Sequence, residues 1–203
     1  DVRRLVEVVY TQIAPMDFAA ILAHPVRWHP LATDADSGES VDLRPFLTEP
    51  ADVQRALHAS ACVPVLAGPP VVIGDRRYVD AGVAQAVPFH TAARQGATHI
   101  LVLRSRRPDE PPTPSRAAAL AARTALRGHG AGFRHALLTN SHRYAADDAM
   151  LSGPAPLPTD YPPLACVVAP TAPSMPGLAP TGEVLRAAFA AGRQAVYDAL
   201  ARS

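Results

Sequence analysis

The sequence predicts an α/β fold with one mostly parallel central sheet. Residues 71–103 run in the order strand, loop, helix, glycine, buried strand, which is the order of a βαβ unit. The run Ile-Leu-Val-Leu at 100–103 is apolar at every position, as in strands that a parallel sheet buries on both faces. Residues 164–168 form a similar apolar run and predict a second buried strand.

The first part of the chain predicts a helix, a hairpin and another helix. Residues 1–23 carry apolar side chains at helical spacing, with a break at Pro15. Residues 26–43 contain two strand-like runs around Asp-Ala-Asp-Ser-Gly, whose residues favour a turn. Residues 48–61 predict a helix, because Pro50 suits its first turn and apolar residues follow on one face.

Strands and helices follow in the rest of the chain. Residues 71–80 predict two short strands joined by a turn at Gly74 and Asp75. Pro88 begins a helix that Gly96 ends. Further helices are predicted at 116–127, 133–151 and 185–200.

The composition fits one compact domain. Hydrophobic residues make up 48% of the chain and charged residues 18%, which is typical of a globular protein. The formal net charge is +1 and the basic residues are scattered, so we expect no nucleic-acid partner. Cys62 and Cys166 are far apart and predict neither a disulfide framework nor a metal-binding pair.

No stretch of the sequence is typical of a membrane span or a secretion signal. No apolar run approaches the roughly eighteen residues of a transmembrane helix, and no signal-peptide pattern opens the chain. The expected location is therefore cytoplasmic or peripheral to a membrane. A helical pattern starts directly after Asp1, which indicates that the natural chain begins further upstream.

Asp80 is the main candidate for a catalytic residue. It stands where a predicted strand gives way to a loop of small residues, Ala81 to Ala84. Ligands gather at the carboxyl ends of strands in open α/β sheets, and a carboxylate there can accept a proton from a nucleophile. The alternative is a turn aspartate that hydrogen-bonds its own backbone. The local sequence leaves both interpretations open.

A longer stretch around Asp80 resembles the patatin-like phospholipase family. The resembling features are Ala32-Thr33-Asp34 before Ser37-Gly38-Glu39, Ala59-Ser60 with Pro64, Tyr78-Val79-Asp80, and Gly96-Ala97 before the apolar strand. Their order and spacing agree over roughly seventy residues, which is more specific than any single short motif.

The resemblance implies a patatin-like α/β sandwich and a serine acyl hydrolase that cleaves fatty-acyl esters of phospholipids or other lipids. Members of the family use a Ser–Asp dyad, with the serine in Gly-x-Ser-x-Gly and the aspartate in Asp-Gly-Gly or Asp-Gly-Ala. By resemblance, Asp80 is the dyad aspartate and acts as general base toward the serine. The apolar loop at 62–72 would help to wall an acyl pocket. We expect no cofactor and no metal. We expect peripheral contact with a membrane.

Two departures from the family pattern bear on this expectation. Ala81 follows Asp80 where the family has glycine, which adds a methyl group where the loop needs a positive φ. No Gly-x-Ser-x-Gly occurs in the 203 residues, and Ser37 lacks the leading glycine of such an elbow. We therefore expect residues 1–203 to be the distal portion of one catalytic domain, inactive alone, whose nucleophile segment lies upstream.

Other residues give weaker signals. Ser60 and Cys62 lie near His58, but residues two apart on a helix point in different directions, so neither is expected to be the nucleophile. His135 and His142 are two helical turns apart, too far to share one metal ion, and predict a polar helix face.

Two other classes of protein compete with the hydrolase interpretation. The alternative is a non-catalytic patatin-like domain that binds lipid or protein. A nucleotide-binding domain is disfavoured, because neither a P-loop nor Gly-x-Gly-x-x-Gly opens any helix.

Overall fold

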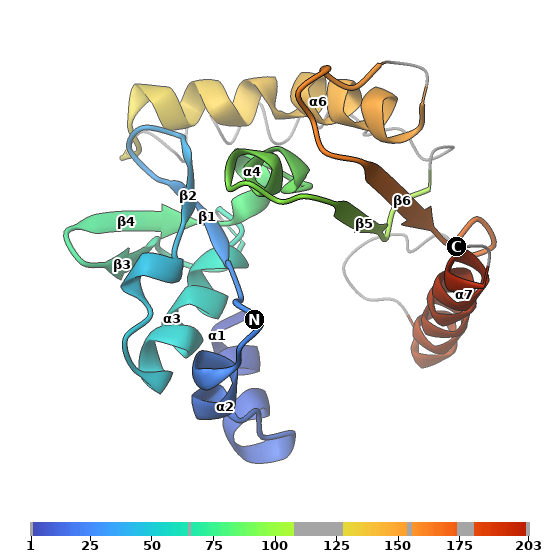
Figure 1. The fold of residues 1–203 in the computed structure, drawn as a ribbon. Helices are drawn as coiled ribbons and strands as arrows, with labels where there is room; N and C mark the ends of the chain where they lie inside the picture. Colours follow the sequence, from blue (N-terminus) through green and yellow to red (C-terminus); the bar gives the residue numbers. More distant parts are fainter. Residues whose placement is uncertain (1, 65, 108–127, 154–155, 174–180, 202–203) are drawn as a thin grey trace. The chain divides into compact units, whose positions relative to one another are not determined.

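The computed structural model divides into two compact units (Figure 1). Unit 1 comprises Asp1–Ala86 and Thr113–Tyr144, and unit 2 comprises Val87–Pro112 and Ala145–Ser203. The residues that the structure describes are 2–64, 66–107, 128–153, 156–173 and 181–201. The helix predicted at 116–127 lies outside these residues, and the predicted single domain stays a prediction.

Unit 1 begins with helices, as predicted. α1 (Val2–Arg4) continues into the π-helix η1 (Leu5–Ile13), and the chain breaks at Pro15 before α2 (Phe18–Ala23). The Asp17 carboxylate accepts a hydrogen bond at 2.8 Å from a main-chain N–H in the first turn of α2. This contact caps the start of the helix.

Four short strands form an antiparallel sheet in unit 1. They are β1 (Leu31–Asp34), β2 (Ser40–Asp42), β3 (Val71–Ile73) and β4 (Arg76–Val79), in the order β2-β1-β4-β3. Both predicted hairpins are confirmed. Gly74, in the turn between β3 and β4, has a φ of 63°, a conformation that glycine adopts without steric cost.

The prediction of a mostly parallel central sheet is wrong for these strands. Short turns join β1 to β2 and β3 to β4, and a parallel connection needs a crossover of about a dozen residues or more. The βαβ unit predicted over 71–103 is also wrong, since β4 and β5 (Ile100–Arg104) belong to different sheets. The order of strand and helix along the chain was right, but the strand partners were not.

The predicted helix at 48–61 is confirmed as α3 (Pro50–Ser60), which packs on the sheet of unit 1. Pro50 stands in its first turn, and the Asp52 carboxylate accepts the Glu49 N–H at 3.0 Å. The buried residues of this core are Ala32, Leu43, Leu47, Val53, Ala56, Ala59, Ile73 and Tyr78.

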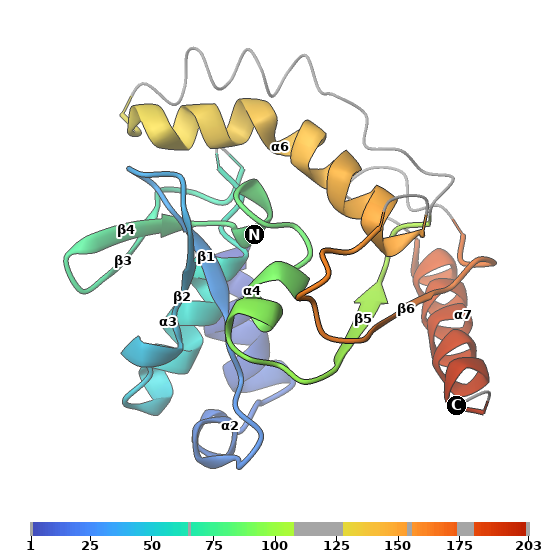
Figure 2. The same cartoon turned by 45° about the horizontal axis from the view of Figure 1, so that its top comes forward.

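α6 (Ala131–Leu151), which confirms the helix predicted at 133–151, begins beside the turn between β1 and β2 (Figure 2). The Gly130 N–H donates to the Ala35 carbonyl at 3.1 Å. A Cβ on Gly132 would lie 2.1 Å from the Ser37 carbonyl oxygen, so this close approach requires glycine. The second core of unit 1 contains the buried residues Ala35, Val79, Val83, Phe133 and Ala136.

Unit 2 contains a two-stranded parallel sheet and two further helices. β5 pairs with β6 (Leu164–Val168), α4 (Phe89–Arg94) precedes β5, and α7 (Gly182–Leu200) is the last helix. These elements confirm the predicted strands at 100–103 and 164–168 and the predicted helices that begin after Pro88 and near 185. Gly96 has a φ of 82° just after α4, as expected of a C-terminal cap.

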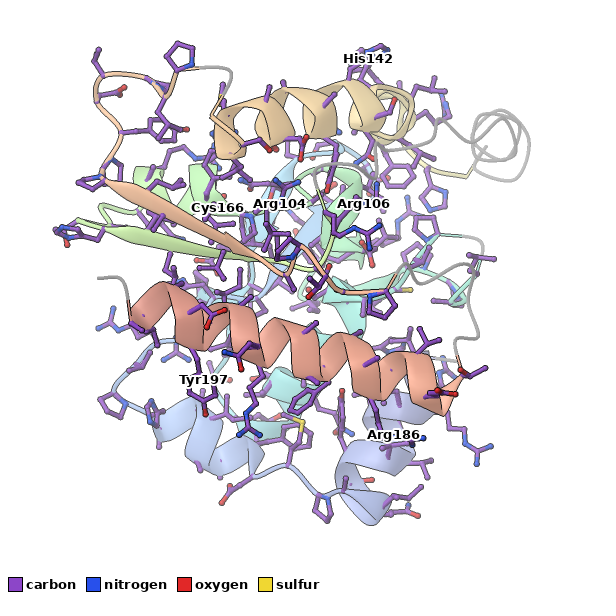
Figure 3. The ribbon with its side chains drawn as sticks, turned by 90° about the vertical axis from the view of Figure 1, so that its right-hand side faces the viewer. Arg104, Arg106, His142, Cys166, Arg186 and Tyr197 are labelled. Atoms are coloured by element: carbon purple, nitrogen blue, oxygen red, sulfur yellow. The ribbon has the colours of Figure 1, made fainter. Side chains whose placement is uncertain are left out.

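The prediction that both faces of β5 are buried is wrong for the described structure. Ile100 and Val102 lie in the core of unit 2, but Leu101 is 56% and Leu103 61% exposed. On α7, Arg186 and Tyr197 are likewise exposed (Figure 3).

No helix in the described part of the chain is both long and apolar enough to cross a bilayer.

Candidate active site

Asp80 follows β4 and caps the short 3₁₀ helix η3 (Ala81–Val83). Its Oδ1 accepts a hydrogen bond from the Gly82 N–H at 2.7 Å. Asp80 is therefore a turn aspartate that bonds its own backbone, which was one of the two interpretations open from the sequence. Within the described residues no hydrogen bond reaches its other carboxylate oxygen, Oδ2, so proton transfer at that atom stays compatible with this cap.

The end of the Asp80 side chain occupies the space that a side chain at Gly82 would need. A Cβ at Gly82 would lie 2.8 Å from Asp80 Oδ1, closer than a carbon and an oxygen can approach without displacement. Ala81 is the first residue of η3, where φ is negative and an ordinary L residue fits. The methyl group of Ala81 is thus accommodated, contrary to the expectation of a positive φ at that position.

The half-buried carboxyl of Asp80 is more basic than an ordinary aspartate. Burial raises its pKa, because it disfavours the charged form, and the Gly82 N–H lowers the pKa by a smaller amount. The net direction is upward. A more basic carboxylate is a stronger proton acceptor, as a general base requires.

Thr33 of β1 fixes the main chain on both sides of the turn. Its Oγ1 donates to the Asp80 carbonyl at 2.8 Å and accepts from the Ala84 N–H at 3.1 Å. The side chain is fully buried. The sequence marked Thr33 only as part of a resembling segment, and its role depends on a pairing between distant strands.

Two polar residues of α6 hold the end of η3. Asn140 Nδ2 donates to the carbonyls of Gly82 at 2.5 Å and Val83 at 3.0 Å. One guanidinium nitrogen of Arg143 donates to the Val83 carbonyl at 2.7 Å. Sequence reasoning missed both residues, although the signal was present: they continue the helix face that begins with Phe133 and Ala136.

The structure brings Cys62 next to Asp80 but does not activate it. The Asp80 N–H donates to the Cys62 carbonyl at 3.0 Å, and the buried Cys62 Sγ lies 3.4 Å from the Pro69 carbonyl oxygen. Burial and, secondly, the charge of Asp80 raise the pKa of the Cys62 thiol, so it stays protonated.

His58 is not coupled to a nucleophile in the described structure. Its Nε2 is buried without a hydrogen bond among the described residues. Burial lowers the pKa of His58, chiefly by disfavouring its charged form. Among the described residues, no hydrogen bond joins His58 to Ser60 or Cys62.

The acidic residues of α6 serve as ion-pair partners in unit 2. His90 Nε2 lies 2.8 Å from an oxygen of Asp147. The buried side chain of Arg104, which is labelled in Figure 3, pairs with Asp148. Over the described ranges, no group of three or more His, Cys, Asp or Glu side chains could hold a metal ion.

Unit 1 also contains an apolar groove of about 480 Å³. It is lined by residues of α2, of α3 and of the segments on either side of α2, and none of them belongs to the loop at 62–72 that was expected to wall an acyl pocket. Its lining residues are Met16, Ala20, Ile21, His24, Val26, Trp28, Val53 and Leu57.

Together, these observations define a mixed α/β protein in which an aspartate with a raised pKa stands at the end of a strand. Residues 1–93, which include Asp80, match the family model of the patatin-like phospholipases. The resemblance seen in the sequence is thereby confirmed. This match points to a protein of the lipid acyl hydrolase kind. Comparison with curated proteins finds no match.

Proposed function

We propose that this chain carries the aspartate of a Ser–Asp dyad in a patatin-like acyl hydrolase, with Asp80 as the general base. The proposal rests on the hydrogen bonding and the burial of the Asp80 carboxylate. Gly82 holds Oδ1, while Oδ2 has no hydrogen bond among the described residues, and burial makes the group basic. The family match that includes Asp80 supports the same role.

In the proposed reaction, Asp80 Oδ2 takes the proton of a serine hydroxyl as the serine oxygen attacks the carbonyl carbon of a fatty-acyl ester. The proton then passes to the departing alkoxide, which leaves as an alcohol, and an acyl-serine ester remains. Water attacks this ester and gives a proton to Asp80, which returns it to the serine as the fatty acid leaves.

The serine of this proposal lies outside the 203 residues, because these contain no Gly-x-Ser-x-Gly. The sheet of unit 2 supports the expectation of further covering structure. Parallel sheets are normally covered on both faces, whereas Leu101 and Leu103 are largely exposed on β5. A segment that carries the serine would account for both observations.

The test compares the 203-residue chain with a protein extended upstream in its reading frame. A serine-reactive fluorophosphonate probe should label the extended protein and leave the 203-residue chain unlabelled. In the extended protein, Asp80→Asn should slow hydrolysis of a fatty-acyl ester by about a hundredfold or more. Asp75→Asn is the matched control, since Asp75 is an exposed carboxylate in the turn between β3 and β4.

Labelling of the 203-residue chain would refute the placement of the serine. Full activity of Asp80→Asn would refute the role of Asp80. An extended protein that binds lipid vesicles but has no reactive serine would favour the alternative, a non-catalytic patatin-like domain.

A further inference from the structure

We propose that Asn140 of α6 is a positioning residue that holds Gly82, and through Gly82 the carboxylate of Asp80. The catalytic meaning of this inference rests on the proposed function, but the positioning itself does not. Asn140 lies beyond residues 1–93, the part of the chain that matches the family. A helix outside the matched region would thus complete the site.

The carbonyls at the end of η3 are bonded by side chains of α6. The last carbonyls of a helix lack partners within the helix and need donors from elsewhere. Asn140 Nδ2 supplies hydrogen bonds to the Gly82 and Val83 carbonyls, and Arg143 supplies a second donor to Val83. α6 therefore acts as an external cap on the turn that follows Asp80.

Gly82 links Asn140 to the carboxylate of Asp80. Its N–H donates to Asp80 Oδ1, and its carbonyl accepts from Asn140. A Cβ at this position would lie 2.8 Å from Asp80 Oδ1. Because glycine has no side chain, nothing within Gly82 itself restricts its backbone. The restraint on the most permissive residue of the turn comes instead from Asn140.

Asn140 lies on the face of α6 that packs in unit 1. Phe133 is fully buried and Ala136 is 4% exposed, and Asn140 and Arg143 follow them at helical spacing on one face. A polar side chain on a packed face is costly unless it is hydrogen-bonded. The close approach of Gly132 to the turn after β1 fixes the other end of this face.

Charge is not the means by which α6 acts on Asp80. The guanidinium of Arg143 donates to the carbonyls of Val83 and Ala136, at 2.7 and 2.6 Å, and makes no described bond to the Asp80 carboxylate. The pKa of Asp80 is raised by burial and lowered by the Gly82 N–H. The effect of Asn140 therefore passes through the position of that N–H.

The experiment measures the Gly82 amide and the Asp80 carboxyl by NMR in the 203-residue chain, which requires no serine. In Asn140→Leu, a substitution of similar size without the amide, hydrogen exchange at Gly82 should be about tenfold faster. The pKa of Asp80 should rise further, because the bond that lowers it is weakened. Exchange at Val79, in the neighbouring strand, should be unchanged.

His142→Ala is the matched control, since His142 is exposed on the same helix (Figure 3). It should alter neither Gly82 exchange nor the Asp80 pKa. Asn140→Gln keeps the amide and should restore part of the protection, and it also serves as the test variant if Asn140→Leu does not fold. Unchanged Gly82 exchange in both folded variants would overturn the proposal.

A second readout separates this proposal from the proposed function. In the extended protein, Asn140→Leu should lower kcat with little change in KM and move the acid limb of the pH profile upward. NMR changes without any change in activity would leave Asn140 as a positioning residue for Asp80 and would refute the role of Asp80 as the base. Altered activity without the NMR changes would overturn the positioning by Asn140.

Discussion

The Thr33 hydroxyl donates to the main-chain carbonyl of Asp80 at 2.8 Å. Thr33 lies opposite Val79 in the antiparallel pair of β1 and β4, so the hydroxyl extends this pairing one residue beyond the end of β4. The same oxygen accepts the Ala84 N–H, on the far side of η3. Thr33 and Asn140 thus hold the turn after Asp80 from a strand and from a helix.

Thr33→Val should destabilise the chain by about 2 kcal/mol. Valine has nearly the same shape, but it removes the hydroxyl that bonds the Asp80 carbonyl and the Ala84 N–H. Each of these groups would keep only a longer main-chain contact, with the Val83 N–H at 3.3 Å and the Ala81 carbonyl at 3.2 Å. Urea denaturation measures the change. Thr139→Val is the control, because among the described residues the Thr139 hydroxyl bonds only to carbonyls of its own helix. Equal effects of the two substitutions would contradict a special role for Thr33.

Gly82→Ala and Ala81→Gly should differ although they alter neighbouring residues. The new Cβ at position 82 would meet Asp80 Oδ1 at 2.8 Å, so Gly82→Ala should cost about 1–3 kcal/mol and displace the carboxylate. Ala81→Gly should cost less than about 1 kcal/mol, through backbone entropy alone. Thermal unfolding of both variants checks the difference. A gain in stability for Ala81→Gly, with little loss for Gly82→Ala, would show that the glycine requirement lies at position 81.

Local signals in the sequence predicted most of the individual elements. The turn residues after Asp34 and at Gly74, and Pro50 at the start of α3, act through their own backbone preferences and their immediate neighbours. For the same reason Asp80 could be placed at the end of a strand. Such information resides within a few residues and is visible in one sequence.

The partners of these elements could not be predicted in the same way. The run 100–103 has the composition of a strand buried on both faces, yet composition does not say what covers Leu101. Likewise, Asn140 and Asp148 look like ordinary polar helix residues until the Gly82 carbonyl and Arg104 are placed against them. The candidate site was therefore predicted as one residue, and its supports were found only in the fold.

Asp80→Asn should stabilise the 203-residue chain at neutral pH. Burial raises the folded-state pKa of Asp80 above its ordinary value of 3.8, so ionising this group opposes folding. The cost is absent below pH 3.8 and grows as the pH rises through the folded-state pKa. The gain in Tm of Asp80→Asn over the parent chain should therefore shrink on acidification from neutral pH.

Asp75→Asn, which alters an exposed carboxylate, should show no such trend. An Asp80→Asn variant that is less stable than the parent chain at pH 7 would mean that the folded state favours the ionised carboxylate. That result would contradict its description as a basic, partly desolvated group.

Asp34→Asn should have the opposite pH dependence. Burial raises the pKa of Asp34, but the N–H groups of Ser37 and Asp36, together with Arg76, outweigh it and bring the pKa below 3.8. The ionised carboxylate therefore stabilises the fold above pH 3.8, and this contribution is lost as the pH falls through the folded-state pKa. The substitution should cost about 1–2 kcal/mol at pH 7 and progressively less in acid.

The two N–H groups should account for most of the Asp34 effect. They lie 2.8 and 2.9 Å from Oδ1, whereas the Arg76 guanidinium is 3.3 Å from Oδ2 and its side chain is 59% exposed. Arg76→Met should consequently cost less than about 1 kcal/mol. Urea titrations of the two variants and the parent chain between neutral and acidic pH compare these contributions. A loss in Arg76→Met as large as that in Asp34→Asn would assign the stabilisation to the ion pair instead of the turn.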